Sequence, residues 1–96
     1  SEHSLCMLNV NGNIWVGLFK NGLDIISTKD YSVRHYSGQQ LGLNESSIYA
    51  ICEDKYGNIW LGNGWGVYKG DAETMKFVNM PEFGLSYIYG KWRIQI

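Results

Sequence analysis

Apolar residues along the chain fall in short runs that are separated by polar turns containing glycine. Residues 14–16 and 48–52 are almost entirely apolar or aromatic, whereas 53–58 and 70–74 are mostly polar. No long segment has the spacing of an amphipathic helix. Strands that are apolar on both faces belong to sheets covered on both sides. The pattern therefore predicts an all-β protein whose short antiparallel strands form sheets that stack face to face.

One sequence unit occurs twice. Residues 12–17 read Gly-Asn-Ile-Trp-Val-Gly, and residues 57–62 read Gly-Asn-Ile-Trp-Leu-Gly, 45 positions later. Upstream, residues 5–9 align with 50–54 at the same offset; downstream, 21–23 align with 65–67 after removal of one residue. Four short antiparallel strands in a repeat of about this length are the design of a β-propeller blade.

Each unit is expected to contain four strands, so the fold is two consecutive four-stranded antiparallel β-propeller blades, a partial propeller. The expected strands are 5–10, 14–18, 23–27 and 31–36 in the first unit, and 47–52, 59–61, 66–69 and 75–79 in the second. We divide the chain into a first blade with its connecting loop (1–45), a second blade (46–82) and a segment (83–96) that starts a third blade or packs as a tail. A closed propeller needs about four to eight blades.

The second unit resembles the two-component regulator propeller repeat, whose pattern is Ile-x-Glu-Asp-x-x-Gly-Asn-Ile-Trp-Leu-Gly. Residues 51–62 match it at every defined position, and the first unit matches from Gly12 onward but has Leu8-Asn9 in place of Glu-Asp. That repeat occurs in tandem in the extracytoplasmic sensor region of bacterial hybrid histidine kinases. The resemblance implies a non-catalytic, periplasmic sensor module of a membrane-anchored regulator, with a carbohydrate as the typical ligand.

Charge and cysteine content narrow the possible partners. Eight basic and nine acidic residues give a net charge of -1, which argues against a nucleic-acid partner. No apolar run approaches the ~20 residues of a membrane span. Cys6 and Cys52 lack zinc spacing, and we expect no metal and no cofactor. We expect two buried free thiols, with a disulfide between them as the alternative. The expected partners are further blades of a parent protein, or other copies of this chain.

Most of the chemically notable residues have structural interpretations. Trp15 and Trp60 occupy equivalent repeat positions and are predicted to pack between blades. Glu53 and Asp54 are more suited to stabilising a turn than to catalysis, because consecutive strand residues point to opposite faces. Asn13 and Asn58 follow turn glycines and suit left-handed backbone or side-chain hydrogen bonding. His35 is expected on a solvated outer strand.

One group of residues suggests a binding site. In a four-stranded meander, the loops between strands two and three and between strands four and one share a rim. The candidate ligand-binding residues in these loops are Lys20, Asn21, Asn63 and Trp65. An indole beside an amide offers a sugar ring a flat apolar face and directional hydrogen bonds. The alternative is that Trp65 packs against a neighbouring blade.

Two other functions remain open at this stage. Streptogramin-lyase-type propellers carry a similar blade motif, but they have Phe-Thr after the tryptophan where this chain has Val16-Gly17 and Leu61-Gly62. A self-associating structural module, in which copies of the chain complete a ring, is the other alternative. The sequence does not specify the ligand, the oligomeric state or the number of blades in a parent protein.

Overall fold

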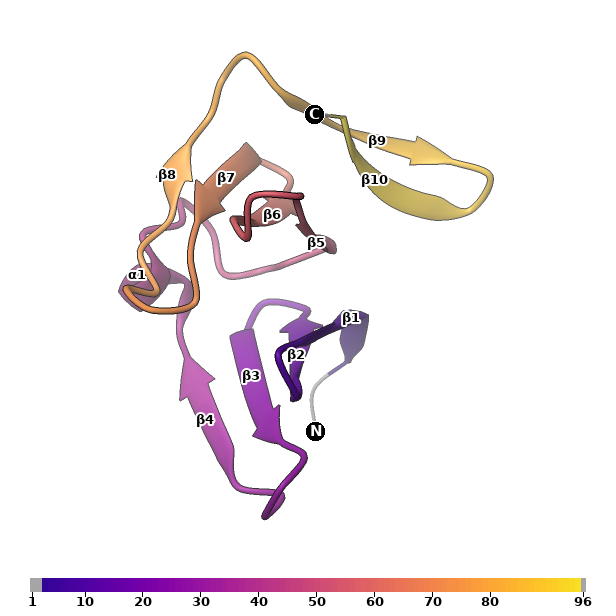
Figure 1. The fold of residues 1–96 in the computed structure, drawn as a ribbon. Coiled ribbons are helices and arrows are strands. Elements are labelled where there is room, and N and C mark those ends of the chain that lie inside the picture. Colours follow the sequence, from indigo (N-terminus) through magenta and orange to yellow (C-terminus); the bar gives the residue numbers. More distant parts are fainter. Residues whose placement is uncertain (1–2, 96) are drawn as a thin grey trace.

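A computed structural model, which describes residues 3–95, contains two four-stranded antiparallel sheets and a two-stranded hairpin (Figure 1). Sheet 1 consists of β1 (Ser4–Val10), β2 (Asn13–Leu18), β3 (Gly22–Ser27) and β4 (Val33–Tyr36). Sheet 2 consists of β5 (Ala50–Glu53), β6 (Ile59–Asn63), β7 (Gly66–Gly70) and β8 (Val78–Asn79). The C-terminal hairpin pairs β9 (Gly84–Ile88) with β10 (Lys91–Gln95), and a single-turn helix, α1 (Gly38–Leu41), lies between the sheets in sequence.

The strands of each sheet follow one another in chain order, and the first strands, β1 and β5, lie against each other (Figure 1). The predicted all-β fold with two antiparallel four-stranded sheets is therefore confirmed. Within residues 3–95 the sheets do not close into a ring, and the arrangement is a partial propeller.

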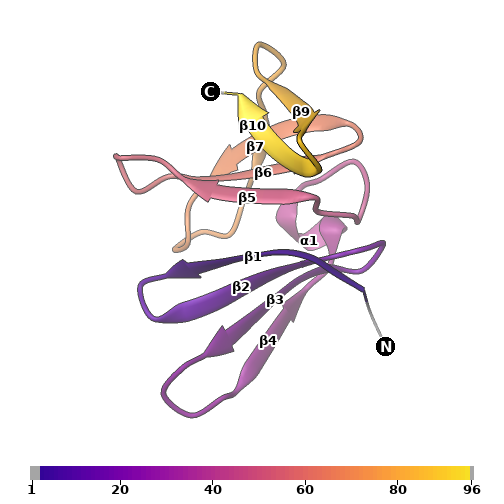
Figure 2. The same ribbon diagram turned by 90° about the vertical axis from the view of Figure 1, so that its right-hand side faces the viewer.

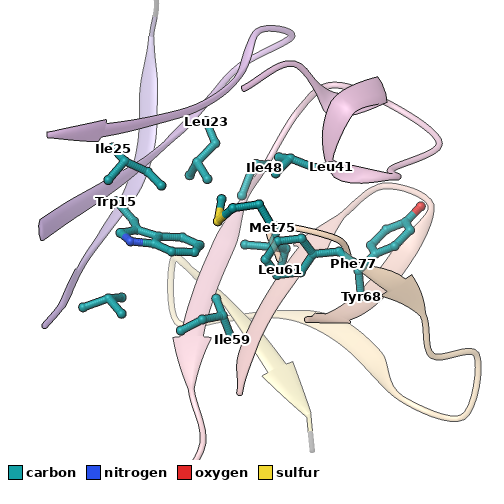
Figure 3. Packing of buried hydrophobic residues seen from close by; sticks show 11 residues of the cluster. Trp15, Leu23, Ile25, Leu41, Ile48, Ile59, Leu61, Tyr68, Met75 and Phe77 are labelled. Atoms are coloured by element: carbon teal, nitrogen blue, oxygen red, sulfur yellow. The ribbon is translucent and has the colours of Figure 1, made fainter. Parts of the chain in front are cut away.

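The hydrophobic core lies between the two sheets (Figure 3). Trp15 is 2% exposed and meets the ring of Phe77 edge-on, with centroids 6.5 Å apart. The segment that joins the sheets contributes Leu41 and Ile48, both fully buried. The other members of the cluster are Val10, Leu23, Ile25, Ile59, Leu61, Tyr68 and Met75. Burying each large apolar side chain stabilises the folded state by about 1.5–3 kcal/mol.

Trp60 repeats the role of Trp15 on the far side of sheet 2. It is 3% exposed and meets Phe83 edge-on at 5.0 Å. The pairing of the strands places Trp15 opposite Ile25 and Trp60 opposite Lys69, which are equivalent positions in the two sheets. The predicted burial of both indoles is confirmed.

The upstream part of the repeat alignment is wrong by one residue. Cys6 pairs with Gly17, whereas Ala50 pairs with Gly62, so Cys6 and not Leu5 is the counterpart of Ala50. The reason is the turn, because four residues (10–13) separate the paired Asn9 and Ile14 whereas five (54–58) separate the equivalent Glu53 and Ile59. The left-handed positions of these turns are Asn11, Gly12 and Gly57, so the left-handed backbone considered for Asn13 and Asn58 is not found.

Three strands are shorter than the sequence predicts. β4 begins at Val33 because Tyr31 has a left-handed backbone (φ 62°). β8 begins only at Val78, because the Asp71 side chain accepts the amides of Glu73 and Thr74 and the turn ends at Met75 with φ 54°. Met75 and Phe77 are nevertheless buried in the core. β5 begins at Ala50, because residues 46–48 are bonded to sheet 1 and its β2–β3 loop and only from Tyr49, whose amide donates to the Gly62 carbonyl, does the chain bond to β6.

The C-terminal hairpin covers the Trp60 face of sheet 2 with its strand order reversed. β10 lies against β5 and β6, while β9 lies against β6 and β7, so the second strand of the hairpin is the inner one. Leu85 and Ile94 pack over Gly62, where an added Cβ would lie 2.7 Å from the Leu85 side chain. Trp92 stacks on Tyr49 with centroids 5.2 Å apart.

Candidate functional site

The loops that carry the candidate binding residues lie at one end of both sheets. Figure 2 shows the β2–β3 loop (19–21), the β6–β7 loop (64–65) and α1 at this end, and the β1–β2 and β5–β6 turns at the opposite end. We call residues 37–49 the connector, the first end the connector rim and the second end the turn rim. The predicted alternation of loops between two rims is thus present in the structure.

The connector binds the β2–β3 loop of sheet 1 through its last residues. The Lys20 amide donates to Ser47 Oγ at 2.8 Å, and the Gly22 amide donates to the Ser46 carbonyl at 2.7 Å. Ser47 is 3% exposed, so its hydroxyl is a buried anchor for the loop. These bonds fix the backbone from which Lys20 projects.

Glu45 of the same connector holds the β6–β7 loop of sheet 2. Its Oε1 accepts the Gly64 amide at 2.8 Å, and its carbonyl accepts the Asn63 side-chain amide at 3.4 Å. The Asn63 Oδ1 then accepts the Trp65 amide at 2.8 Å. Both loops are therefore attached to one short segment, which places them on a common surface.

The structure corrects the expected role of Asn63. Its side chain is 2% exposed, because Asn63 is the last residue of β6 and points to the same face of the sheet as Leu61, toward sheet 1. The Asn63 Nδ2 donates to the Glu45 carbonyl, and its Oδ1 accepts the Trp65 amide. Asn63 therefore positions Trp65 and offers no amide to solvent.

The other candidate residues are exposed at the connector rim. The Trp65 side chain is 65% exposed. Lys20 and Asn21 are exposed, and the Lys20 ammonium lies 5.2 Å from the centre of the Phe19 ring. Phe19 is itself 40% exposed. The rim thus carries an indole, a second aromatic ring and a cation on backbone held by the connector.

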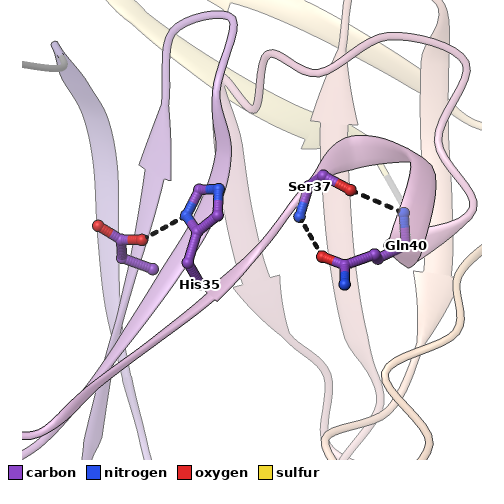
Figure 4. A network of polar contacts seen from close by, with 4 residues as sticks. His35, Ser37 and Gln40 are labelled. Atoms are coloured by element: carbon purple, nitrogen blue, oxygen red, sulfur yellow. Dashed lines mark hydrogen bonds and ion pairs between the residues drawn. The ribbon is translucent and has the colours of Figure 1, made fainter.

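Sequence reasoning missed the helix in the connector. Ser37 Oγ accepts the Gln40 amide at 3.1 Å, and the Gln40 side chain accepts the Ser37 amide at 2.8 Å, which is a capping box (Figure 4). The signal was available, because Ser37 and Gln40 have the capping-box spacing and Gly42 follows the helix as its C-cap. The helix buries Leu41 in the core and so docks the connector.

Asp54 stabilises a turn, as the sequence predicts. Its carboxylate accepts hydrogen bonds from the Trp60 indole at 2.9 Å and from the amides of Tyr56 and Asn58, both at 2.9 Å. The Trp60 bond and the bonds from residues 56 and 58 lower the pKa of Asp54 to about 2. A carboxyl group with a pKa this low stays ionised near neutral pH and is poorly suited to general acid–base catalysis there.

Lowering the pH should reduce the stability of the fold, because Asp54 becomes protonated. Because the pKa of Asp54 is lower in the folded chain than its ordinary 3.8, its stabilising contribution is complete above that value and is lost as the pH falls toward about 2. We expect the urea midpoint to drop across this window in the native chain and to drop less in Asp54→Asn. The neighbouring Glu53→Gln is the control and should follow the native curve. Parallel curves for Asp54→Asn and the native chain would contradict the assignment.

Cys6 and Cys52 are free and only half-buried, where the sequence predicts buried free thiols. Burial raises the pKa of the Cys6 thiol to about 11, and the thiol lies 3.5 Å from the Ile48 carbonyl. Such a thiol is almost entirely protonated at neutral pH and is a poor nucleophile. Cys6 also borders an open groove of about 400 Å³ between β1, β5 and β10.

In residues 3–95 no group of three or more His, Cys, Asp or Glu side chains could hold a metal ion. The described part of the chain also has no helix of the length and apolarity needed to cross a membrane.

Comparison with known proteins identifies the repeat. Residues 42–65, from the connector through β6 to Trp65, match the family described as two component regulator propeller. The matched segment supplies Glu45, Asn63 and Trp65 to the connector rim. No curated protein matches the chain.

A solved structure shares the fold. It is the extracellular domain of BT3049 from B. thetaiotaomicron, described as a hybrid two component system, and it matches with a TM-score of 0.70 and 24% sequence identity. The match covers 96% of this chain but only 12% of that chain. The likeness extends the propeller fold from the matched repeat to nearly the whole sequence.

Proposed function

We propose that the chain is a non-catalytic part of the extracytoplasmic, periplasmic sensor region of a two-component regulator, and that it contributes to carbohydrate recognition at the connector rim. Further blades of the same protein are the expected partners. The propeller repeat in residues 42–65 and the extracellular origin of the similar solved structure support the location and the class of function.

The exposed Trp65 is the observation that carries the ligand proposal. Most of the Trp65 surface is open to solvent and makes no contact with apolar neighbours. The hydrogen bonds from Gly64 to Glu45 and from the Trp65 amide to Asn63 hold the backbone of its loop in one place. Rigid loops that present an aromatic ring suit the apolar face of a sugar. Lys20 and Asn21 lie on the same rim and supply polar groups, so the proposed contacts are Trp65, Lys20 and Asn21, with Asn63 as a positioning residue.

Loss of the indole should weaken binding without unfolding the chain. Trp65→Ala is expected to cost about 1.5–3 kcal/mol of binding free energy, the value of burying a large apolar side chain. Calorimetric titration with a panel of neutral and acidic oligosaccharides measures this loss. Tyr56→Ala is the matched control, because Tyr56 is 77% exposed but lies on the turn rim.

Two results would reject the proposal. One is a screen in which no oligosaccharide binds. The other is a Trp65→Ala protein with a lowered thermal midpoint but unchanged affinity in its folded fraction, which would make Trp65 a packing residue.

A further inference from the structure

The C-terminal hairpin ends in an aromatic turn that extends beyond both four-stranded sheets (Figure 1). Tyr87, Ile88 and Tyr89 are 61%, 38% and 98% exposed. An added Cβ at Gly90 would meet no atom within 4 Å, so the turn is not packed against another element. We call residues 87–91 the hairpin tip. Apolar side chains exposed together on one element indicate an interaction surface.

Tyr89 occupies a turn position that favours other residues. Tyr89 and Gly90 have φ 52° and 79°, and Ile88 pairs with Lys91, so a two-residue turn with left-handed backbone closes the hairpin. Such turns favour Asn, Asp or Gly at both central positions. The Tyr89 ring is almost fully exposed and adds no packing to the fold. It is therefore available to a partner outside the chain.

The hairpin is cationic, although the chain as a whole is slightly acidic. Lys91 and Arg93 are exposed and lie two residues apart on β10, hence on the same face of that strand. Within residues 3–95 neither cation has an ion-pair partner. Residues 84–95 contain no Asp or Glu, whereas the whole chain has a net charge of -1. The hairpin tip therefore suits an anionic partner.

Apolar residues of β1 continue the surface of the hairpin tip. Leu5 and Met7 are 39% and 68% exposed, and they line the groove of about 400 Å³ together with Gly90, Lys91 and Trp92. Trp92 is itself 42% exposed. The partner of this surface therefore has to accept aromatic and aliphatic side chains as well as positive charge.

We infer that the hairpin tip binds the surface of a lipid bilayer that contains anionic lipids. Tyrosine and tryptophan rings favour the headgroup level, where the apolar part of the ring leaves water and its polar atom stays hydrated. Apolar burial and attraction between cations and anionic lipids together set the strength of such binding. The hairpin supplies both. This inference does not depend on the ligand proposed for the connector rim.

The β5–β6 turn provides a comparison within the same chain. Tyr56 is 77% exposed, and the Lys55 ammonium lies 5.3 Å from the centre of its ring. Glu53 and Asp54 directly precede this pair, so the acidic groups outnumber the cation. Anionic lipids should not attract this turn, although it also presents a tyrosine beside a lysine.

Sedimentation of the chain with lipid vesicles tests the inference. The vesicles contain phosphatidylcholine alone, or phosphatidylcholine and phosphatidylglycerol in equal parts. We expect the chain to bind the mixed vesicles and to bind the neutral vesicles more weakly. High salt should weaken only the binding to mixed vesicles, because it screens the attraction between cations and anionic lipids.

Two variants separate the aromatic from the ionic contribution. Tyr89→Asn should lower the partition coefficient about tenfold on both kinds of vesicle, the effect of no longer burying a large apolar side chain. Because Asn suits the left-handed position, its urea midpoint should be unchanged or higher, which excludes unfolding as the cause. Lys91→Gln should lower the coefficient about fivefold on mixed vesicles only, equivalent to about 1 kcal/mol for one cation at an anionic surface.

Matched variants in the β5–β6 turn are the controls. Tyr56→Asn should leave both partition coefficients unchanged, and Lys55→Gln should change binding to mixed vesicles less than Lys91→Gln does.

Three outcomes would overturn the inference. The first is a chain that does not sediment with the mixed vesicles, and the second is an equal loss of binding in Tyr89→Asn and Tyr56→Asn. The third is a chain that is dimeric by light scattering and becomes monomeric in Tyr89→Asn, because a second copy would then cover the hairpin tip.

Discussion

Replacing Trp60 by alanine should lower the free energy of unfolding by about 3–5 kcal/mol, the usual cost of removing a buried tryptophan. Trp60 is 3% exposed, packs edge-on against Phe83 and donates its indole N–H to Asp54. The substitution removes the packing between sheet 2 and the hairpin and the donor that organises the 54–58 turn. Because a domain has only about 5–15 kcal/mol of stability, much of the chain should be unfolded at modest urea concentrations.

Two variants separate the contributions to this loss. Trp60→Phe keeps a ring against Phe83 but has no N–H for Asp54, so it should destabilise less and also raise the pKa of Asp54. Trp92→Ala removes an indole that is 42% exposed and should cost less than Trp60→Ala. Urea unfolding followed by circular dichroism measures all three. An unchanged midpoint in Trp60→Ala would show that the indole does not pack as described.

Gly22→Ala is expected to destabilise the chain by about 2–5 kcal/mol. Gly22 has φ +80°, and a Cβ there would clash with the Tyr36 carbonyl oxygen. The Gly22 amide is also bonded to the Ser46 carbonyl, so the loop cannot move away without losing that bond. The left-handed conformation costs an L-residue about 1–2 kcal/mol, and overpacking adds about 1–3 kcal/mol.

Gly57→Ala provides the matched control. Gly57 has φ +86°, but nothing lies within 4 Å of an added Cβ. It should therefore show the backbone cost alone, about 1–2 kcal/mol. The difference between the two variants in urea unfolding measures the close approach of the β2–β3 loop to β4. Equal losses in Gly22→Ala and Gly57→Ala would contradict that close contact.

The sequence predicts which residues lie on the connector rim but not which of them the connector buries. Alternation of loops between two ends of a meander is a local property, and it correctly placed Lys20, Asn21 and Trp65 on one rim. Strand alternation puts Asn63 on the same face as Leu61, but the neighbour that its amide meets there is the Glu45 carbonyl, which lies 18 residues away and reaches it only in the folded chain. Whether that face is open to solvent or covered by another segment is set by such long-range contacts, which strand periodicity does not contain.

The sequence by itself determined the repeat, the order of the eight blade strands, the burial of Trp15 and Trp60 and the turn role of Asp54. These features follow from the alternation of apolar and polar residues and from turn residues close to one another in the chain. Only the tertiary structure decided the one-residue offset of β1, the reversed order of the hairpin and the different surroundings of the two faces of sheet 1. The offset of β1 follows from the length of its turn, which the registers of the two sheets reveal. The other two features depend on which surface a strand meets after folding, and the same apolar pattern is compatible with more than one neighbour.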